Sequence, residues 1–245
     1  MKNSILLVLL ASSFFSYSQQ KESGGTSLLK KAGSAFKSKG GGSSLSNDEI
    51  IAGLKEALSV GAQNSSNKLS ALDGFFANAA IKVLMPAEAK KVESTLRNAG
   101  MGEMVDNAIL SMNRAAEEAS KSAAPIFVDA IRQMGFQDAL SILKGTDTAA
   151  TSYLKGKTLA ALTTAFKPVI DQALLKTDAT KYWKSVFETY NKLPTTFKKI
   201  NTDLSGYVTD KALIGLFYQV AIEEQKIRKD PAARVNDVLK KVFGN

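Results

Sequence analysis

Asn113, Arg114 and Glu117 are polar residues that lie within about one turn of a predicted helix, beside an apolar stripe that includes Met112 and Ala116. A charged group at the edge of such a stripe must be paired, because an unpaired buried charge costs several kcal/mol. Two interpretations therefore stay open. The group is a structural ion pair, or it belongs to a ligand cleft in which Arg114 holds an anionic head group.

A second polar group lies near the end of the most apolar segment of the chain. Glu224 and Arg228 are one helical turn apart there, and Arg234 follows beyond Asp230-Pro231. Structural pairing and anion binding by Arg228 are again the two interpretations.

Aromatic side chains are concentrated on one predicted helix, where Tyr182, Trp183, Phe187 and Tyr190 span two turns. They are expected to be core residues, with Trp183 as a packing anchor, or else the wall of an apolar pocket. The candidate ligand-binding residues are thus Asn113, Arg114, Glu117, Tyr182, Trp183, Glu224, Arg228 and Arg234.

Histidine and cysteine are both absent from the 245 residues. Zinc sites are built mainly from these two residue types, and serine and cysteine hydrolases usually take up a proton with histidine. Any catalysis would need carboxylates, Lys, Tyr or Ser with a shifted pKa. We therefore predict no metal site and no cofactor, and we assign no catalytic residue.

Three short motifs resemble known sites but are incomplete. Gly156-Lys157-Thr158 matches the end of a phosphate-binding loop, but Thr151 stands where the first glycine belongs. Residues 201–206 resemble a calcium loop, but its twelfth position is Ala212 instead of a glutamate, so a turn into the next helix is expected. Ser-x-x-Lys pairs such as Ser141/Lys144 and Ser152/Lys155 lack the other elements of a penicillin-binding enzyme.

Helix start and stop signals recur from Ser46 onward, beginning with the capping box Ser46-Asn47-Asp48-Glu49. Alternating β-branched runs are missing, and residues 80–84 are expected to be an extended loop after Asp73-Gly74. The chain is predicted to be all-α, a single bundle of about ten helices around a buried central helix at 208–229. The predicted helices are 46–61, 86–100, 103–124, 125–135, 136–143, 148–166, 168–175, 179–191, 208–229 and 231–243.

The first residues have the pattern of a secretory signal peptide. Lys2 precedes the apolar run from Ile5 to Ala11, and small residues lead to an expected cut after Ser18. Residues 19–45 are rich in Gly, Ser and Lys and are predicted to be a flexible linker before a domain at 46–245. Without cysteine the protein is not expected to be a lipoprotein, so we predict a periplasmic or secreted protein.

The net charge of +9 would favour contact with anionic surfaces, but lysine-rich helix faces on a soluble exported protein are the preferred interpretation. No nucleic-acid-binding motif accompanies this charge, so nucleic acid is not expected as a partner. Weak contact with an anionic membrane is a prediction for the linker, through Lys30, Lys31, Lys37 and Lys39.

Several blocks of residues resemble an uncharacterised group of exported bacterial proteins, the domain-of-unknown-function family four-one-nine-seven. The resemblance covers about 46–243 and implies an exported helical domain, but it supplies no activity and no site residues. The blocks that carry it include Glu49–Leu58, Asp73-Gly74-Phe75, Ser111–Glu117, Pro125-Ile126-Phe127, Lys181-Tyr182-Trp183, Tyr207–Leu213, Gly215-Leu216-Phe217 and Pro231–Arg234.

Two function classes follow from these patterns. The first is an exported non-catalytic domain that binds an envelope component, a macromolecular partner or an apolar or anionic ligand. The second is a carboxylate/lysine-based envelope hydrolase. The second would require a recessed carboxylate of raised pKa beside an open cavity.

Overall fold

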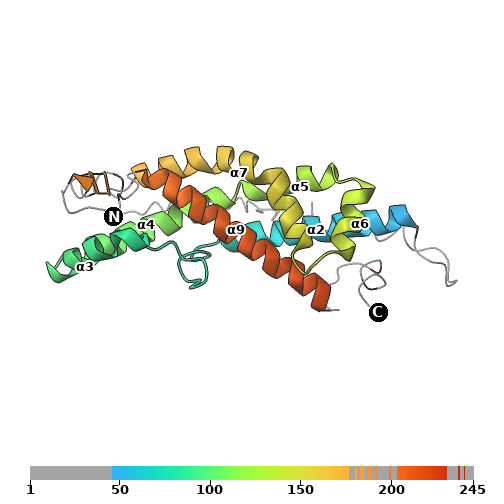
Figure 1. The fold of residues 1–245 in the computed structure, drawn as a ribbon, viewed down its shortest axis with the longest axis horizontal. Helices are drawn as coiled ribbons and strands as arrows, with labels where there is room; N and C mark the ends of the chain where they lie inside the picture. The colour runs from blue at the N-terminus through green and yellow to red at the C-terminus, as the bar shows by residue number, and fades with distance from the viewer. Residues whose placement is uncertain are drawn as a thin grey trace, which may run out of the picture. The chain divides into compact units, whose positions relative to one another are not determined.

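The computed structural model describes residues 46–176, 180, 183–184, 187–188, 191–192, 199, 203–230, 237 and 240. The regular structure of these residues is entirely helical (Figure 1), which confirms the all-α prediction. The predicted signal peptide and linker, residues 1–45, lie outside the described residues. The helices are α2 (Asn47–Ser70), η1 (Ala87–Ala89, a 3-10 helix), α3 (Lys90–Asn98), α4 (Gly102–Ser120), α5 (Ala123–Arg132), α6 (Phe136–Lys144), α7 (Ala149–Leu175) and α9 (Leu204–Lys229).

Helix α2 begins at the predicted capping box. The Ser46 hydroxyl accepts a hydrogen bond from the Glu49 N–H at 3.3 Å, and the Glu49 carboxylate accepts one from the Ser46 N–H at 2.8 Å. Two amide groups that a helix start leaves without helical partners are thereby satisfied. The predicted apolar face of α2 is buried, including Leu54 and Leu58.

The prediction of about ten helices is not supported, and several predicted boundaries are wrong, such as that of the first helix, which continues to Ser70 instead of ending near Gly61. The sequence pattern places a helix end at Phe166 and a new start at Pro168, but both residues lie inside α7. Pro168 is on the exposed side of this helix, so the hydrogen bond that it cannot donate is lost next to solvent. One continuous helix can therefore bury a stripe with a spacing of four that runs past the proline, namely Leu162, Phe166, Ile170 and Leu174.

Another boundary differs by two residues, because α5 begins at Ala123 and not at Pro125. Pro125 therefore lies in the first turn of α5, where a backbone N–H would have no partner within the helix.

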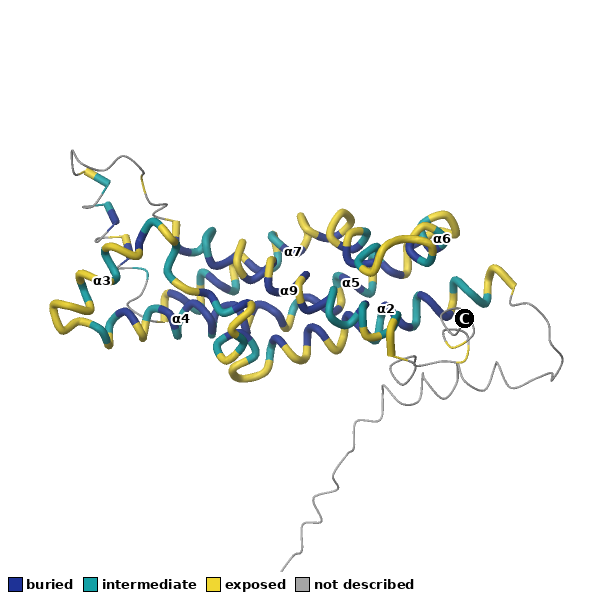
Figure 2. The backbone as a smooth tube through the Cα atoms, turned by 60° about the horizontal axis from the view of Figure 1, so that its bottom comes forward, coloured by how far each residue is buried: buried dark blue, intermediate teal, exposed yellow. Residues whose placement is uncertain are grey.

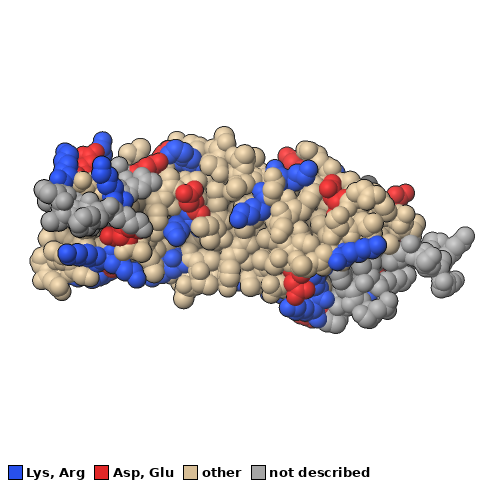
Figure 3. All heavy atoms as spheres, viewed as in Figure 1, with Lys and Arg blue, Asp and Glu red and all other residues tan. Residues whose placement is uncertain are grey.

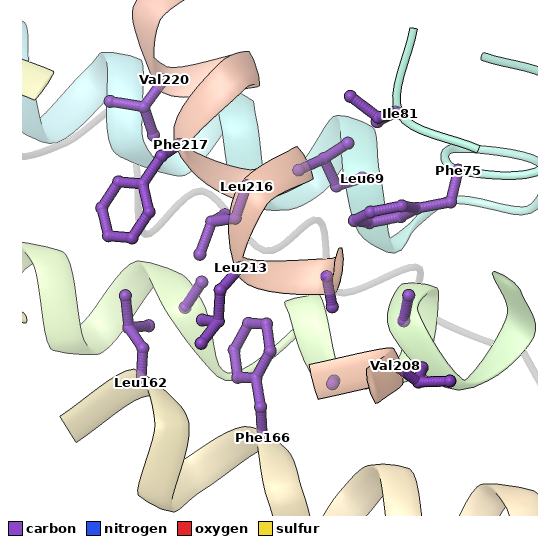
Figure 4. Packing of buried hydrophobic residues seen from close by; sticks show 14 of the residues in the cluster. Leu69, Phe75, Ile81, Leu162, Phe166, Val208, Leu213, Leu216, Phe217 and Val220 are labelled. Atoms are coloured by element: carbon purple, nitrogen blue, oxygen red, sulfur yellow. The ribbon is translucent and has the colours of Figure 1, made fainter. Parts of the chain in front are cut away.

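Helix α9 packs against α7, α2 and α4. The buried residues of α9 lie with the buried residues of these helices in the interior of the bundle, where they are drawn in dark blue in Figure 2. Leu213 of α9 lies near Leu162 and Phe166 of α7 (Figure 4). Phe217 meets the edge of Phe127 with ring centroids 5.8 Å apart. These contacts make α9 the core helix of the described bundle.

One face of α9 is not buried, and for this face the prediction of a fully surrounded helix is wrong. Ile214 is 62% exposed and Tyr218 is 43% exposed. Both lie on the same line along the helix as Tyr207 and Lys211, because positions i, i+4, i+7 and i+11 share one face. The apolar segment 212–222 therefore supplies both the core and a surface.

The loop at 71–86 crosses α9 at Gly215. A Cβ atom on Gly215 would lie 2.5 Å from Cε1 of Phe75 and 3.3 Å from Cβ of Ile81. Phe75 and Ile81 are buried there, as Figure 4 shows. Residues 82–86 have no regular secondary structure, which agrees with the predicted extended loop. No helix within the described residues combines the length and the apolar character needed to cross a bilayer.

Candidate functional site

Asn113 of α4 holds the loop 71–86 through Val83. Its Oδ1 accepts a hydrogen bond from the Val83 N–H at 2.9 Å, and its Nδ2 donates to the Val83 carbonyl at 2.8 Å. The other Nδ2 proton goes to the Ile109 carbonyl at 2.7 Å. Asn113 is fully buried, and both protons of its amide are used within the fold. No donor of this side chain is therefore left for a ligand.

Glu117 and Arg114 fix the beginning of the same loop. Glu117 Oε1 accepts hydrogen bonds from the N–H groups of Phe75 at 3.1 Å and Phe76 at 3.2 Å. Glu117 Oε2 pairs with Nη1 of Arg114 at 2.6 Å, and Nη2 of Arg114 reaches Oδ1 of Asp73 at 2.7 Å. The hydrogen bond to Glu117 is the main reason that the pKa of Arg114 is raised. This geometry favours the structural interpretation of the cluster.

Glu224 of α9 caps the beginning of α7. Its carboxylate accepts hydrogen bonds from the N–H groups of Ala150 at 2.9 Å and Thr151 at 2.8 Å, and from the Thr151 hydroxyl at 2.8 Å. The residue at the N-cap position of α7, Thr148, makes no side-chain capping bond of its own. A buried carboxylate from another helix therefore satisfies the free amides and the positive end of the α7 dipole.

Arg228 completes this second group. Its Nη2 donates to Glu224 Oε1 at 2.8 Å and to the Ile142 carbonyl at 2.7 Å, so it joins α9 to the end of α6. The sequence correctly groups Glu224 with Arg228, and their arrangement too is that of a structural pair. Arg234, predicted to lie beside them, is outside the described residues.

Trp183 behaves as the packing anchor that the sequence suggests. It is buried, and its ring centroid lies 4.6 Å from that of Phe187 in an edge-on arrangement. It also stacks on Tyr207 with centroids 5.9 Å apart. Its neighbour Tyr182 lies outside the described residues.

The short motifs fall in helices and caps. Gly156-Lys157-Thr158 lies in the middle of α7, where the Thr158 hydroxyl donates to the Leu154 carbonyl at 2.7 Å. This segment is therefore not a phosphate-binding loop. The Asp203 carboxylate accepts a hydrogen bond from the Gly206 N–H at 2.9 Å and caps α9. The predicted turn into the next helix is thus seen at Asp203, within the part of the segment that the structure describes.

A hollow of about 360 Å³ lies where α6 meets α7. Ser141, Ser152 and Tyr153 line it, but no lysine or arginine is among the described lining residues. Its one carboxylate, from Asp138, accepts a hydrogen bond from the Gly135 N–H at 3.0 Å. The lysines of the two Ser-x-x-Lys pairs do not line this hollow, so it brings no serine and lysine together.

A second hollow, of about 420 Å³, has a different chemistry. Three lysines from three elements line it: Lys82 from the loop, Lys90 from α3 and Lys211 from α9. Glu88 is the acidic residue among its described lining residues. We call it the lysine hollow, and its apolar lining comes from Leu84, Met85, Pro86 and the ring of Tyr207.

The three lysines make no salt bridge to any other described residue. Lys82 Nζ lies 3.7 Å from the centroid of the Phe76 ring, and Lys211 Nζ lies 5.6 Å from that of Tyr207. These aromatic contacts satisfy the ammonium groups only in part. The lysine hollow is therefore lined by more cationic than anionic side chains, which is a suitable setting for an anion.

Tyr207 forms a fixed wall of the lysine hollow. Its hydroxyl donates to the Leu84 carbonyl at 2.8 Å, which ties the loop to α9. Burial, with a smaller contribution from the charge of Glu88, raises the pKa of Tyr207 to about 12. The phenol therefore stays neutral at physiological pH and does not oppose an anion.

An apolar surface continues from the lysine hollow along α9. We call Leu84, Ile214 and Tyr218 the apolar row; all three are largely exposed. Figure 3 shows the face on which α9 lies, with broad areas that carry no charged group and basic side chains at several points around them. This surface is not apparent from the sequence, because the apolar segment 212–222 is expected to be core. The one sequence signal for the surface is the helical spacing of Tyr207, Lys211, Ile214 and Tyr218.

The chain belongs to a family whose description is "Protein of unknown function (DUF4197)", and the family model matches residues 44–244. This match confirms the family that the sequence resembles, and it does not bear on export. No curated protein and no solved structure matches the chain.

Proposed function

We propose that this member of the DUF4197 family is an exported, non-catalytic domain that binds an anionic ligand with an apolar part in the lysine hollow. One observation carries the proposal. Lys82, Lys90 and Lys211 converge from three elements beside exposed apolar side chains, and none of them forms a salt bridge with a described carboxylate. A concave site with cations and apolar walls is suited to such a ligand.

The polar clusters that the sequence singles out are less suited to this role. Arg114 is engaged by Glu117 and Asp73, and Arg228 by Glu224 and the Ile142 carbonyl. An anion would have to displace a carboxylate that also holds backbone amides. The free energy of that exchange is unfavourable, because it leaves those buried amides without acceptors.

The hydrolase alternative has no specific support. Among the described carboxylates with shifted pKa values, Asp106 and Asp147 are both shifted down, chiefly by hydrogen bonds from Arg97 and Lys229. A general acid needs a shift in the opposite direction. Neither carboxylate lines one of the two hollows. We therefore propose binding alone.

Titration of the chain from Gln19 onward with octyl phosphate tests the proposal, with octyl glucoside as the uncharged comparison. Trp183 is the only tryptophan of the protein and stacks on Tyr207, so its fluorescence reports on the wall of the lysine hollow. Octyl phosphate is expected to change this fluorescence, whereas octyl glucoside is not.

Substitutions locate the binding site. Lys211→Gln is expected to weaken octyl phosphate binding by about tenfold or more, since a hydrogen bond to a charged group contributes about 1.5–3 kcal/mol. Lys144→Gln, an exposed lysine outside the lysine hollow, is the matched control and should bind normally. No binding, or equal binding by the two variants, would contradict the proposal.

N-terminal sequencing of the protein from the envelope tests export. An intact Met1 on a cytoplasmic protein would be the contrary result.

A further inference from the structure

The apolar row has a position that the other exposed apolar residues of the described chain do not share. Leu84 lines the lysine hollow directly, and Ile214 follows the hollow residue Lys211 by one turn of α9. Tyr218 is one turn further along the same line, about 16 Å from Tyr207 at the helical rise. The lysines of the hollow and the apolar row therefore adjoin on one surface.

The exposure of these side chains shows what kind of partner they fit. Leu84 is 53% exposed and Ile214 62%, on the outward face of a helix and on the loop beside it. None of the described side chains encloses an alkyl chain beyond the lysine hollow, so a single bound amphiphile would leave the part of its chain that extends past the hollow in water. A broad apolar layer can cover all three residues at the same time.

A lipid bilayer supplies such a layer together with the matching charge. Its phosphate groups border its hydrocarbon, so one bilayer surface can meet the lysines and the neighbouring apolar side chains together. Lysine stems can lie along apolar surface while their ammonium groups reach phosphate, and tyrosine is favoured at this boundary. The net charge of +9 adds attraction to anionic lipids.

We infer that the lysine hollow and the apolar row together form one docking surface for an anionic lipid bilayer. The inference rests on the proposed function and names the form in which the anionic ligand is presented. It concerns a surface of the folded domain, and it is separate from the membrane contact predicted for Lys30, Lys31, Lys37 and Lys39, which lie outside the described residues.

Sedimentation of the chain from Gln19 onward with lipid vesicles tests this inference. Vesicles of phosphatidylcholine with phosphatidylglycerol are compared with vesicles of phosphatidylcholine alone. The double variant Ile214→Ser/Tyr218→Ser removes the apolar row on α9 without touching the core. Leu159→Ser is the matched control, since Leu159 is 40% exposed on α7 and lines neither hollow.

The unchanged chain is expected to sediment with the anionic vesicles and not with the neutral ones. The affinity of the double variant for these vesicles should be lower by about tenfold or more, because two apolar side chains no longer leave water on docking. Leu159→Ser should bind as the unchanged chain does. In a background with Lys30, Lys31, Lys37 and Lys39 changed to Gln, the double substitution at Ile214 and Tyr218 should still weaken vesicle binding.

Four results would overturn the inference. If octyl phosphate binds in the lysine hollow but anionic vesicles do not, the ligand is a free molecule and only the proposed function stands. If neither binds, both proposals fail. If vesicles bind equally well to the double variant, or if Leu159→Ser weakens binding as much, the membrane contact lies elsewhere on the chain.

Discussion

Polar side chains of α4 serve as hydrogen-bonding partners for a loop that has no secondary structure of its own. Backbone groups that are buried in such a loop need partners from elsewhere in the fold. Asn113 supplies both a donor and an acceptor to Val83, and Glu117 accepts from Phe75 and Phe76. The two side chains thus position the loop that contributes Lys82 and Leu84 to the lysine hollow.

Replacing Arg114 tests the structural role of this cluster. Arg114→Ala is expected to lower the free energy of unfolding by about 1–3 kcal/mol, because Glu117, whose side chain is 6% exposed, loses its cation. Arg132→Ala is the control, since Arg132 forms an exposed pair with Asp129 and should cost less than about 1 kcal/mol. Chemical denaturation measures both. Equal stability of the two variants would contradict the structural role.

Gly215 is the residue at which a single added methyl group should separate the loop from α9. Gly215→Ala is expected to lower the free energy of unfolding by about 1–3 kcal/mol, because the new Cβ would meet the Phe75 ring. Gly156→Ala in α7 has no atom within 4 Å of its Cβ and should stabilise the helix by about 0.5–1 kcal/mol. Thermal melts compare the two, and a stabilised Gly215→Ala variant would show that the loop does not pack as described.

Among the helices, α7 depends on a residue that is far away in the sequence. Glu224 of α9 accepts from the first amides of α7 and pairs with Arg228, which in turn holds the end of α6. Three helices therefore meet at one buried carboxylate. The loss of this carboxylate should affect the beginning of α7 before it affects the rest of the bundle.

Glu224→Ala is expected to lower the free energy of unfolding by about 3–5 kcal/mol, because it leaves Arg228, whose side chain is 10% exposed, without its carboxylate. Hydrogen exchange at Ala150 and Thr151 should also become faster, since their N–H groups lose the acceptor. Glu118→Ala removes an exposed carboxylate that pairs with Lys121 and serves as the control, with little change expected. Unchanged exchange at Ala150 in the Glu224 variant would contradict the cap.

Local signals were enough to predict the fold class and several element boundaries. The capping box at Ser46 and the loop after Asp73-Gly74 both occur as their residue types indicate. Pro168 was misleading, because the rule that proline begins or ends a helix is local. Burial of the stripe from Leu162 to Leu174 decides the outcome, and that burial depends on the helices around α7.

The proposed binding surface could not be predicted for a similar reason. Hydrophobic periodicity shows that Ile214 and Tyr218 are on a helix, but it does not show which side of a mostly apolar helix lacks a neighbour. Lys211 is distant in sequence from Lys82 and Lys90 and meets them only through the packing of the loop and α3 near α9. The grouping of Glu224 with Arg228, by contrast, needed only the spacing of one helix turn.

At the scale of the whole molecule, the described bundle has a buried interior whose polar groups are mostly paired and one surface where cations and apolar groups meet. The polar clusters stabilise the fold, and the lysine hollow with the apolar row is left as the candidate for binding. In the described residues these two roles are carried by different side chains. Variants can therefore change binding while stability is kept.

We propose that ligands bind in the lysine hollow and not at the two polar clusters. A titration of backbone amide chemical shifts with octyl phosphate distinguishes these places. The largest shifts are expected at residues 82–90 and 207–218, with little change at Glu117 and Arg228. Shifts centred on Arg114 or Arg228, or on the hollow between α6 and α7, would contradict it.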